Sequence, residues 1–327
     1  MSEQLHKIGV VGLGLMGSSI IVALLKAGCE VVAVTPLVEE FEEGKNRIIE
    51  QLQLAAGMKL LTEDVPSYRQ RLQVSKDFQD LKPCQLVIEC IIEVEAIKRE
   101  VYHKIELEVA ADCIIASNTS AIPINILQRY LERPNRFMGI HWAEPAYATR
   151  FLEITCGELT EVRLAEMVQE AALGWEKEPT LLYKDIRGFI TNRLMYAVYR
   201  QGFELINNNT VDMAGLDKCF QYDIGSWITI MGIFKRMDYI GLHHYLHTFE
   251  QIFPKLTQSD VVPPIMDSII KENGRGIHNL IGLYPHDEQS ASSLENNFAA
   301  FNEEIYLLAD RYRAKLKELN LTETNGK

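Results

Sequence analysis

The sequence lacks the features of a membrane protein or a nucleic-acid-binding protein. No apolar run reaches the roughly 18 residues that span a bilayer, and residues 1–7 are polar, without the apolar core of a secretory signal. Basic residues are outnumbered, with 33 Lys and Arg against 45 Asp and Glu, which gives a formal net charge of −12. A chain this acidic repels a phosphate backbone. We therefore expect a cytoplasmic protein that binds neither membranes nor nucleic acid.

Cysteine is also sparse, and its spacing suggests no bonding framework. The six cysteines are scattered without a Cys-x-x-Cys pair, and several lie inside apolar runs. This pattern favours reduced thiols in the core over disulfides or metal ligands. His243, His244 and His247 have a spacing that can bind a metal from a helix. Because no further ligand candidate stands out, we expect no metal site.

What the sequence does have is the composition of a globular protein with two domains. Hydrophobic residues make up 47% and charged residues 24% of the 327 positions, which is close to globular averages, and a chain of this length typically forms two domains. Short β-rich runs alternate with helical patterns to about residue 185, and only helical patterns follow. An α/β domain followed by a helical domain is therefore expected.

The individual elements follow from the same local patterns. The expected strands are 7–11, 30–34, 86–92, 113–116, 137–140 and 152–155. The expected helices of the first domain are 18–26, 38–72 with breaks near Gly57 and Pro66, and 94–111. Those of the second domain are 190–206, 213–222, 228–233, 243–253 and 293–319.

A glycine-rich turn near the N-terminus is the first motif with a chemical meaning. The β-rich run Lys7–Val11 leads into Gly12-Leu-Gly-Leu-Met-Gly17, and an apolar helix and a second β-rich run follow. In such a turn Gly12 allows the sharp exit from the strand, and Gly14 lets the backbone approach a pyrophosphate. Gly17 lets the helix pack on the strand. The helix N-terminus then offers unpaired N–H groups to the phosphates.

The motif in this strand and helix setting predicts dinucleotide binding. The fold class that we predict is an α/β Rossmann-type N-terminal domain, residues 1–186, with an all-α C-terminal domain, residues 187–327. Thr35 stands where an acidic residue normally ends the second strand and binds the adenosine ribose, and Glu39 and Glu40 follow slightly late. No Lys or Arg comes before Lys45 to accept a 2′-phosphate. NAD is therefore favoured as the cofactor, and NADP stays open.

Two strand ends supply candidate groups for acid–base chemistry. Residues 117–120, Ser-Asn-Thr-Ser, follow a strand at the edge where such sheets bind ligands, and His141 ends the next β-rich run. Glu153 lies at the start of the run after that. A histidine can take a proton from an alcohol, and a carboxylate on its other nitrogen fixes the tautomer and stabilises the imidazolium. Their spacing alone leaves open that His141 and Glu153 are unrelated.

The order of several motifs makes the chain similar to the 3-hydroxyacyl-CoA dehydrogenase family. The matching segments are Gly12-Leu-Gly-Leu-Met-Gly17, Glu89-Cys-Ile-Ile-Glu93 with Lys98, Ser117-Asn-Thr-Ser120, Arg133-Pro-Asn-Arg136, Gly139-Ile-His141, Leu152-Glu153-Ile154, Lys184-Asp185, Gly188-Phe-Ile-Thr-Asn192-Arg193-Leu194 and Met231-Gly232. This resemblance covers most of the chain. It implies a helical C-terminal domain that forms a homodimer.

The resemblance also implies roles for single residues. His141 and Glu153 correspond to the family's catalytic pair, and Ser120 and Asn192 to residues that bind or orient the substrate. Glu93 and Lys98 correspond to residues at the cofactor. The full set of residues expected at the cofactor is Gly12, Gly14, Met16, Gly17, Thr35, Glu93, Lys98 and Asn118.

Several positions depart from the family pattern and bear on the substrate. Glu144 stands where the family usually has Asn, and an ionised Glu cannot donate a hydrogen bond to a substrate carbonyl. The family's Gly-Pro-Phe-Glu is Gly232-Ile-Phe-Lys235 here, and Arg187 replaces a Pro. Residues 223–227 and Tyr196 resemble the branch that holds L-gulonate 3-dehydrogenase (the lambda-crystallin type) and carnitine dehydrogenase.

Glu144 is a further candidate substrate-binding residue, with three alternatives. Its carboxylate could enter the pocket with Arg150 as its partner, pair with a cationic substrate group beside Trp142, or face solvent. Tyr68, Arg69 and Arg71 could meet a CoA phosphate or lie at the surface.

The expected function is that of an NAD-dependent oxidoreductase of a secondary 3-hydroxy group. Its substrate would be a small hydroxy compound, with conversion of 3-hydroxyacyl-CoA to 3-oxoacyl-CoA in fatty acid metabolism as the first choice. A free hydroxy acid of the gulonate or carnitine type is the alternative substrate class. A non-catalytic dinucleotide-binding protein is the alternative from a different class.

Overall fold

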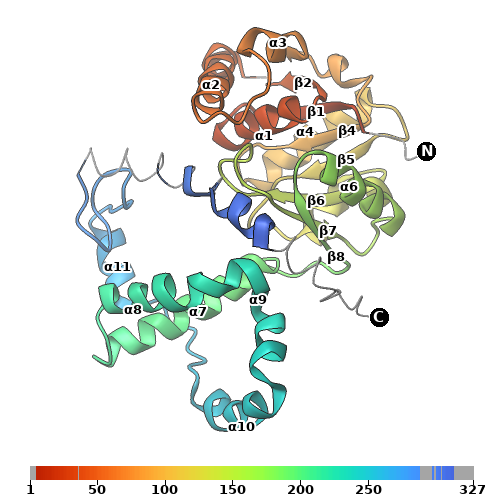
Figure 1. Ribbon diagram of the computed structural model, residues 1–327. Coiled ribbons are helices and arrows are strands. Elements are labelled where there is room, and N and C mark those ends of the chain that lie inside the picture. The colour runs from red at the N-terminus through yellow and green to blue at the C-terminus, as the bar shows by residue number, and fades with distance from the viewer. Residues whose placement is uncertain (1–4, 36, 288–296, 298–299, 303, 313–327) are drawn as a thin grey trace. The chain divides into compact units, whose positions relative to one another are not determined.

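The computed structural model describes residues 5–35, 37–287, 297, 300–302 and 304–312. The chain forms two units, Met1–Arg193 and Leu194–Lys327. The first unit contains a β-sheet covered by helices, and the described part of the second is helical (Figure 1). The predicted fold class, a Rossmann-type domain followed by a helical domain, is confirmed. The exact domain boundary between residues 186 and 187 stays a prediction.

The sheet of the first unit has eight strands in the order β3-β2-β1-β4-β5-β6-β7-β8. Neighbouring strands are parallel except for β6 and β7, which pair antiparallel. The strands are β1 Lys7–Val11, β2 Glu30–Val34, β3 Leu72–Ser75, β4 Leu86–Glu89, β5 Ile114–Ser117, β6 Phe137–Trp142, β7 Phe151–Cys156 and β8 Glu178–Leu182. The carboxyl ends of β1, β4, β5 and β6 therefore meet at one edge of the sheet.

The helices alternate with these strands and then continue into the second unit. The first unit contains α1 Leu15–Lys26, α2 Val38–Gly57, α3 Val65–Gln70, η1 Phe78–Leu81, α4 Glu95–Glu108, α5 Ile124–Leu127, η2 Gln128–Tyr130, η3 Pro134–Arg136 and α6 Val162–Gly174. Helix α7 Thr191–Asn207 crosses the division between the units. It is followed by α8 Met213–Cys219, η4 Phe220–Ile224, α9 Gly225–Ile240, α10 Leu242–Ile252, η5 Phe253–Lys255 and α11 Pro264–Lys271.

Two strands were missed by the sequence patterns, and both lie at the edges of the sheet. β3 is short and only half-buried, and β8 contains Pro179. Proline cannot donate to a neighbouring strand, so it is typical of edge strands and weakens the sequence signal. The expected break in 38–72 is present, because Asp64 caps α3 by accepting from the Ser67 amide at 3.0 Å. The helix expected at 293–319 lies mostly outside the described residues, although 304–312 are helical.

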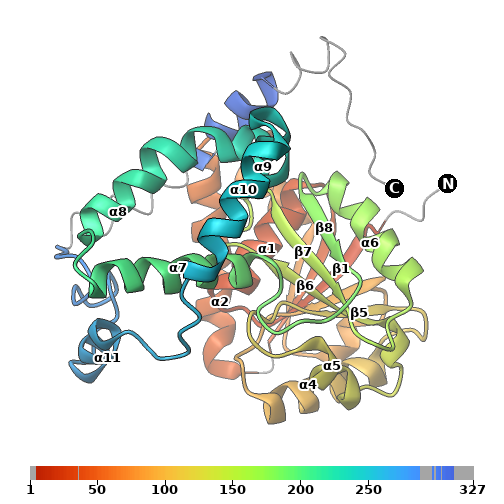
Figure 2. The same cartoon turned by 90° about the horizontal axis from the view of Figure 1, so that it is seen from below.

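The sheet separates two apolar cores. Val10 of β1 faces the core formed with α1, α2 and α6, and the next residue, Val11, faces the core formed with η1, α4 and α5. This alternation is the consequence of strand geometry. Figure 2 shows α4 and α5 on one side of the strands and α6 on the other. Both faces are buried, which explains why the central strands are nearly continuous apolar runs.

The second unit has a different character. In its described part, Ala309 is the one apolar side chain with less than a tenth of its surface exposed. Large side chains are instead exposed along its helices, among them Tyr222 at 79%, Phe234 at 74% and Tyr239 at 72%. Helix α9 is kinked at Gly232, which has φ +68°. An amphipathic helix is stabilised mainly by packing, so these helices lack most of the burial that a single domain provides.

Candidate active site

The glycine-rich turn between β1 and α1 has the geometry of a phosphate-binding loop. The Gly12 amide donates to the Val34 carbonyl at 2.9 Å, which holds the loop against the end of β2. Gly12 has φ +101°, and a Cβ on Gly17 would lie 1.9 Å from the Gly12 oxygen. Any larger residue at position 17 would push α1 away from the turn. The loop and the helix start are therefore pressed together as a nucleotide site requires.

Gly14 is the residue that leaves space for a ligand. It caps α1, and a Cβ built on it would meet no atom within 4 Å. The first turn of α1, which includes Met16, has no acidic side chain that would oppose a phosphate. The space above Gly14 and the positive end of the helix dipole fit the pyrophosphate of a dinucleotide.

His141 and Glu153 are brought together by the antiparallel pairing of β6 and β7. They are partners in the strand register, although twelve residues separate them in the sequence. Nδ1 of His141 lies 3.0 Å from Oε2 of Glu153, and its Nε2 lies 3.1 Å from Oγ of Ser120. The imidazole is thus held at both nitrogens. A carboxylate at Nδ1 leaves Nε2 to exchange a proton with a substrate.

Glu153 also holds the beginning of α7. Its Oε1 accepts from the backbone N–H groups of Ile190 at 3.1 Å and Thr191 at 2.9 Å, and from the Thr191 hydroxyl at 3.2 Å. Burial of this carboxyl acts to raise its pKa, but the hydrogen bonds from His141 and from these amides outweigh burial and lower the pKa below its ordinary value. Glu153 is therefore ionised at neutral pH. Asn192, the next residue of α7, is half-buried.

Aromatic side chains surround the His141 ring. The ring of Phe151 stands perpendicular to it, with centroids 5.6 Å apart, and the ring of Phe189 lies 5.4 Å away. Phe189 is buried and has φ +48°, a conformation that is uncommon for a bulky residue. Backbone strain of this kind collects at functional sites. The base thus has apolar walls on the side that β7 and the start of α7 provide.

Glu93 positions the segment that carries Ser120. Its carboxylate accepts from the Ser120 amide at 2.9 Å and from the Thr119 hydroxyl at 3.0 Å. Nζ of Lys98 lies 3.5 Å from the same carboxylate. The structure therefore places Glu93 between Lys98 and the Ser120–His141 contact. Their role at the cofactor stays a prediction.

Glu89, at the end of β4, is a residue that the sequence reasoning did not single out. It is fully buried and accepts four hydrogen bonds, from Lys98 Nζ at 2.6 Å, Tyr102 Oη at 2.7 Å, Ser117 Oγ at 2.7 Å and the Ile91 amide at 2.8 Å. Lys98 is 1% exposed, so its ammonium group is committed to this network. The signal that could have found Glu89 is an acid at the end of an apolar strand, where it must be paired.

Asn118 and Trp142 connect neighbouring strand ends. Oδ1 of Asn118 accepts from the Trp142 amide at 3.0 Å. The Trp142 side chain is 2% exposed and stacks on Trp175 with centroids 6.0 Å apart, while Lys177 Nζ lies 5.2 Å from its ring centre. Trp142 is thus a core residue. Little of its ring is open to a ligand, and the alternative that Glu144 pairs with a cationic substrate group beside Trp142 stays a prediction.

The loop of residues 143–149 joins β6 to β7 and is held by hydrogen bonds from Lys177 and to Ser19. Lys177 donates to the carbonyl oxygens of Ala146, at 2.5 Å, and Thr149, and the Ala146 amide donates to Oγ of Ser19 in α1 at 2.7 Å. Burial, with a smaller contribution from nearby Lys26, lowers the pKa of Lys177 to about 7. The loop therefore bridges the cofactor helix and the strands that carry His141 and Glu153.

Glu144 lies on this loop and is exposed. Burial raises the pKa of Tyr147 to about 12, and the charge of Glu144 adds to the effect. Its role in substrate binding stays a prediction.

The described residues give no sign of a metal centre or a membrane segment. They contain no group of three or more His, Cys, Asp or Glu that could hold an ion. His247 contacts Glu250 at 4.0 Å on the surface of α10. No helix in the described ranges is both long and apolar enough to cross a bilayer. All six cysteines have free thiols, and Cys219 is the exposed one.

Comparison with known proteins identifies matches along most of the chain. Residues 7–186 match the NAD-binding domain of 3-hydroxyacyl-CoA dehydrogenases, and residues 188–285 match their C-terminal domain. The chain is 29% identical over 295 residues to 5-formyl-3-hydroxy-2-methylpyridine 4-carboxylate 5-dehydrogenase of Mesorhizobium japonicum, covering 89% of this chain and 94% of the relative. It is 27% identical over 292 residues to 3-hydroxybutyryl-CoA dehydrogenase of Mycobacterium tuberculosis, covering 85% and 99%.

Solved structures agree with these matches. The crystal structure of a 5-formyl-3-hydroxy-2-methylpyridine 4-carboxylic acid 5-dehydrogenase, described as an NAD+-dependent dismutase, has a TM-score of 0.85 at 25% identity and covers 94% of this chain and 99% of that one. The crystal structure of M. tuberculosis FadB2 has a TM-score of 0.71 at 26% identity and covers 87% and 100%.

Proposed function

Because the chain belongs to the 3-hydroxyacyl-CoA dehydrogenase family and is an NAD-dependent dehydrogenase acting on a hydroxyl group, we propose that it converts 3-hydroxyacyl-CoA to 3-oxoacyl-CoA, with His141 as the general base. The observation that carries this proposal is the hydrogen-bonded series Ser120–His141–Glu153 at the carboxyl edge of the sheet. Such a reaction would belong to fatty acid metabolism, and a cytoplasmic location stays a prediction.

The turn formed by Gly12, Gly14 and Gly17 would hold NAD, which would supply the acceptor for a hydride from the carbinol carbon. In the proposed mechanism Nε2 of His141 takes the hydroxyl proton, and the ionised Glu153 stabilises the resulting imidazolium. The substrate hydroxyl would lie beside Ser120, whose Oγ is 3.1 Å from Nε2 and can donate to the substrate oxygen. Asn192, at the start of α7, would contact the same substrate. The rings of Phe151 and Phe189 beside His141 would limit the access of water during the reaction.

A free carboxylic acid is the second candidate substrate class, and two observations favour it. The relative with 29% identity is a pyridine 4-carboxylate dehydrogenase. In addition, two of the three residues considered for a CoA phosphate are engaged elsewhere, whereas Arg69 is exposed. Tyr68 is fully buried, with its hydroxyl 3.1 Å from the Thr62 amide, and Arg71 pairs with Glu63 at 3.0 Å. A non-catalytic dinucleotide-binding protein is no longer a useful alternative, because the chain is a dehydrogenase.

The helical unit supports the further proposal of a homodimer. Its described helices expose apolar side chains on a scale that monomeric domains avoid, including Leu246 at 61% and Phe253 at 56%. A second copy of the chain would cover these side chains. Light scattering or sedimentation of the purified protein at micromolar concentration is expected to give twice the mass of 37.3 kDa. A monomer under these conditions would contradict the proposal.

The proposed function is tested by NADH absorbance with a substrate panel. Acetoacetyl-CoA with NADH tests the acyl-CoA reaction, and free 3-hydroxybutyrate, gulonate and carnitine with NAD+ test the alternative. His141→Ala should lower turnover about 10²–10⁴-fold, the usual contribution of a positioned general base, and leave the dissociation constant for NADH unchanged. His103→Ala, on the exposed face of α4, is the matched control. Turnover of His141→Ala within twofold of wild type would refute the assignment of the base.

A further inference from the structure

Helix α2 packs with one face on the glycine-rich turn. A Cβ built on Gly44 would lie 2.5 Å from the Cβ of Leu13, so the helix and the turn are in direct contact at this point. Arg47 donates from Nη1 to the Leu13 carbonyl at 2.6 Å. Glu40 lies four residues before Gly44, and residues four apart share a helix face. Glu40 therefore projects from the packed face of α2, one turn closer to the end of β2.

The Glu40 carboxylate reaches the residue that ends β2. The hydroxyl of Thr35 donates to Oε2 of Glu40 at 3.2 Å, and the Thr35 side chain is fully buried. The residue before it, Val34, accepts the Gly12 amide at 2.9 Å. The carboxylate is thus fixed beside the phosphate-binding turn. It lies beside the end of β2, where an acidic side chain normally follows the second strand.

We propose that Glu40 binds the adenosine ribose of NAD and makes the site prefer NAD over NADP. A carboxylate has two oxygens, so Glu40 can keep Thr35 on Oε2 and accept a ribose 2′-hydroxyl on Oε1. A 2′-phosphate at the same position would meet a like charge, which disfavours NADP. In this chain Thr35 is then a positioning residue. It holds the acid that comes from the next helix instead of the strand.

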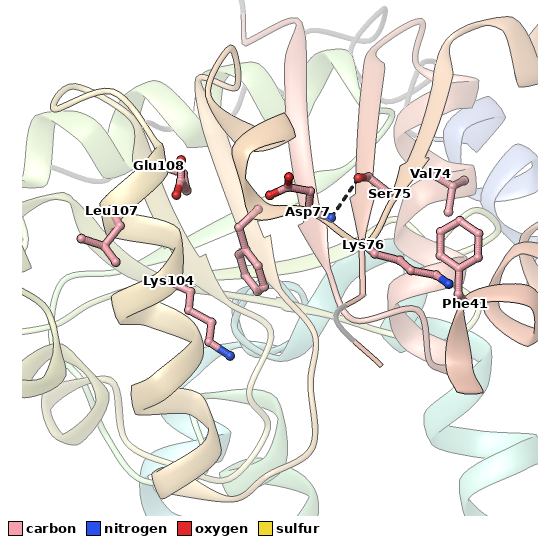
Figure 3. Close-up of a pocket in the computed structure, with 9 residues that line it drawn as sticks. Phe41, Val74, Ser75, Lys76, Asp77, Lys104, Leu107 and Glu108 are labelled. Carbon is pink, nitrogen blue, oxygen red and sulfur yellow. Dashed lines mark hydrogen bonds between the residues drawn. The ribbon is translucent and has the colours of Figure 1, made fainter. Parts of the chain in front are cut away.

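The basic residues near α2 and the end of β3 offer a competing possibility, a site for the 2′-phosphate of NADP. A pocket of about 730 Å³ begins where β3 ends, and Lys76 and Lys104 are among its lining residues. Figure 3 shows how these side chains lie. Nζ of Lys76 lies 4.5 Å from the ring centre of Phe41. Arg47 is already paired with Glu43. We take Lys76 as the residue that would bind the 2′-phosphate of NADP. Its substitution separates a phosphate site from the proposed ribose contact of Glu40.

The experiment measures dissociation constants for NADH and NADPH by fluorescence titration of the full chain, without substrate. Glu40→Gln should weaken NADH about tenfold, as expected for a hydrogen bond to a charged group, and should reduce the NADH-over-NADPH preference about 30-fold or more by also removing the like charge. Glu39→Gln is the matched control, because it removes the same charge from the neighbouring exposed residue. The same preference should appear as tighter binding of 5′-AMP than of 2′,5′-ADP. These two ligands differ only in the 2′-phosphate and lack the nicotinamide half of the cofactor.

Two results would overturn the proposal. One is an equal effect of Glu40→Gln and Glu39→Gln on the preference. The other is a preference that changes with Lys76→Met and not with Glu40→Gln. Should Glu40→Gln fail to fold, Thr35→Val and Thr35→Ser decide the question. Loss of the hydroxyl in Thr35→Val should weaken NADH about fivefold relative to Thr35→Ser, and equal affinities would refute the role of Glu40.

Discussion

Replacement of Glu153 by Gln perturbs the candidate dyad at a position where the structure predicts two distinct outcomes. The Glu153 carboxylate is 2% exposed and offers only acceptors, one oxygen to His141 and the other to three donors of Ile190 and Thr191. Glutamine has one acceptor oxygen and one NH₂ group. Its single oxygen can accept hydrogen bonds either from the start of α7 or from His141, but not from both.

The first outcome is a loss of turnover with a stable fold. If the amide oxygen faces Ile190 and Thr191, its NH₂ group faces Nδ1 of His141. Nδ1 must then accept a hydrogen bond, which places the ring proton on Nε2. The Nε2 atom can no longer take a proton from the substrate. Turnover should fall about 10²–10⁴-fold with NADH affinity close to wild type, and the melting temperature should fall only by the stabilisation that the ionised carboxylate provides.

The second outcome is a loss of stability. If the amide oxygen faces His141, its NH₂ group meets the N–H donors of Ile190 and Thr191. A buried donor without an acceptor costs about 1–3 kcal/mol, so the start of α7 would loosen and the melting temperature would fall. The first orientation satisfies the three donors of Ile190 and Thr191, whereas the second satisfies only the one donor of His141, so we expect the first outcome.

The assay combines NADH formation at several pH values with thermal unfolding, and Thr191→Val is the control because it removes one donor and leaves the dyad intact. The ionised Glu153 has a lowered pKa in the folded state, so its stabilisation is complete above its ordinary value of about 4.5 and is lost as the pH falls through the folded value. Turnover of Glu153→Gln within twofold of wild type, with an unchanged melting temperature, would refute this reasoning.

Three further predictions concern the loop regions around the site. Gly14→Val should weaken NADH binding well over tenfold while the melting temperature stays near wild type, because its Cβ enters ligand space and not protein; unchanged affinity by titration would contradict the phosphate loop. Between the folded pKa of Lys177, about 7, and its ordinary value of 10.5, the unfolded state binds more protons at this side chain than the folded state, so Lys177 makes stability rise with pH. Above the ordinary thiol value of 9.0, buried cysteines with raised pKa values act in the opposite direction. The melting temperature should therefore rise between about pH 7 and pH 9. Lys177→Met should abolish that rise and exposed Lys82→Met should not. Glu144→Asn should lower the pKa of Tyr147 in an ultraviolet titration and leave the pH–rate profile in place; a profile shifted to lower pH would instead place Glu144 at the base.

Local sequence was sufficient where the structure depends on neighbouring residues. The glycine turn could be predicted because the contact between Gly12 and Gly17 is made within a few residues of the chain. The central strands could be predicted because burial on both faces requires continuous apolar runs. The edge strands β3 and β8 were not predicted, because each has a neighbouring strand on one side only and so tolerates polar residues. In β8 the open side also tolerates Pro179.

Residues of the candidate site were recognised from ordered motifs, but their contacts were not. The sequence contained His141, Glu153 and Ser120. Only the register of β6 with β7 and the end of β5 placed Glu153 and Ser120 within 3.1 Å of the two nitrogens of His141. The burial of Trp142 likewise depends on Trp175, from a distant segment.

The sequence by itself determined the order of an α/β and a helical domain, the dinucleotide turn and the identity of the candidate acid–base residues. Only the tertiary structure decided that Glu89 is a fully buried acceptor of four hydrogen bonds and that Glu40 from α2 accepts the Thr35 hydroxyl at the end of β2. The physical reason is that a carboxylate's environment is made by groups from several elements. Its partners are set by packing, and no local pattern encodes them.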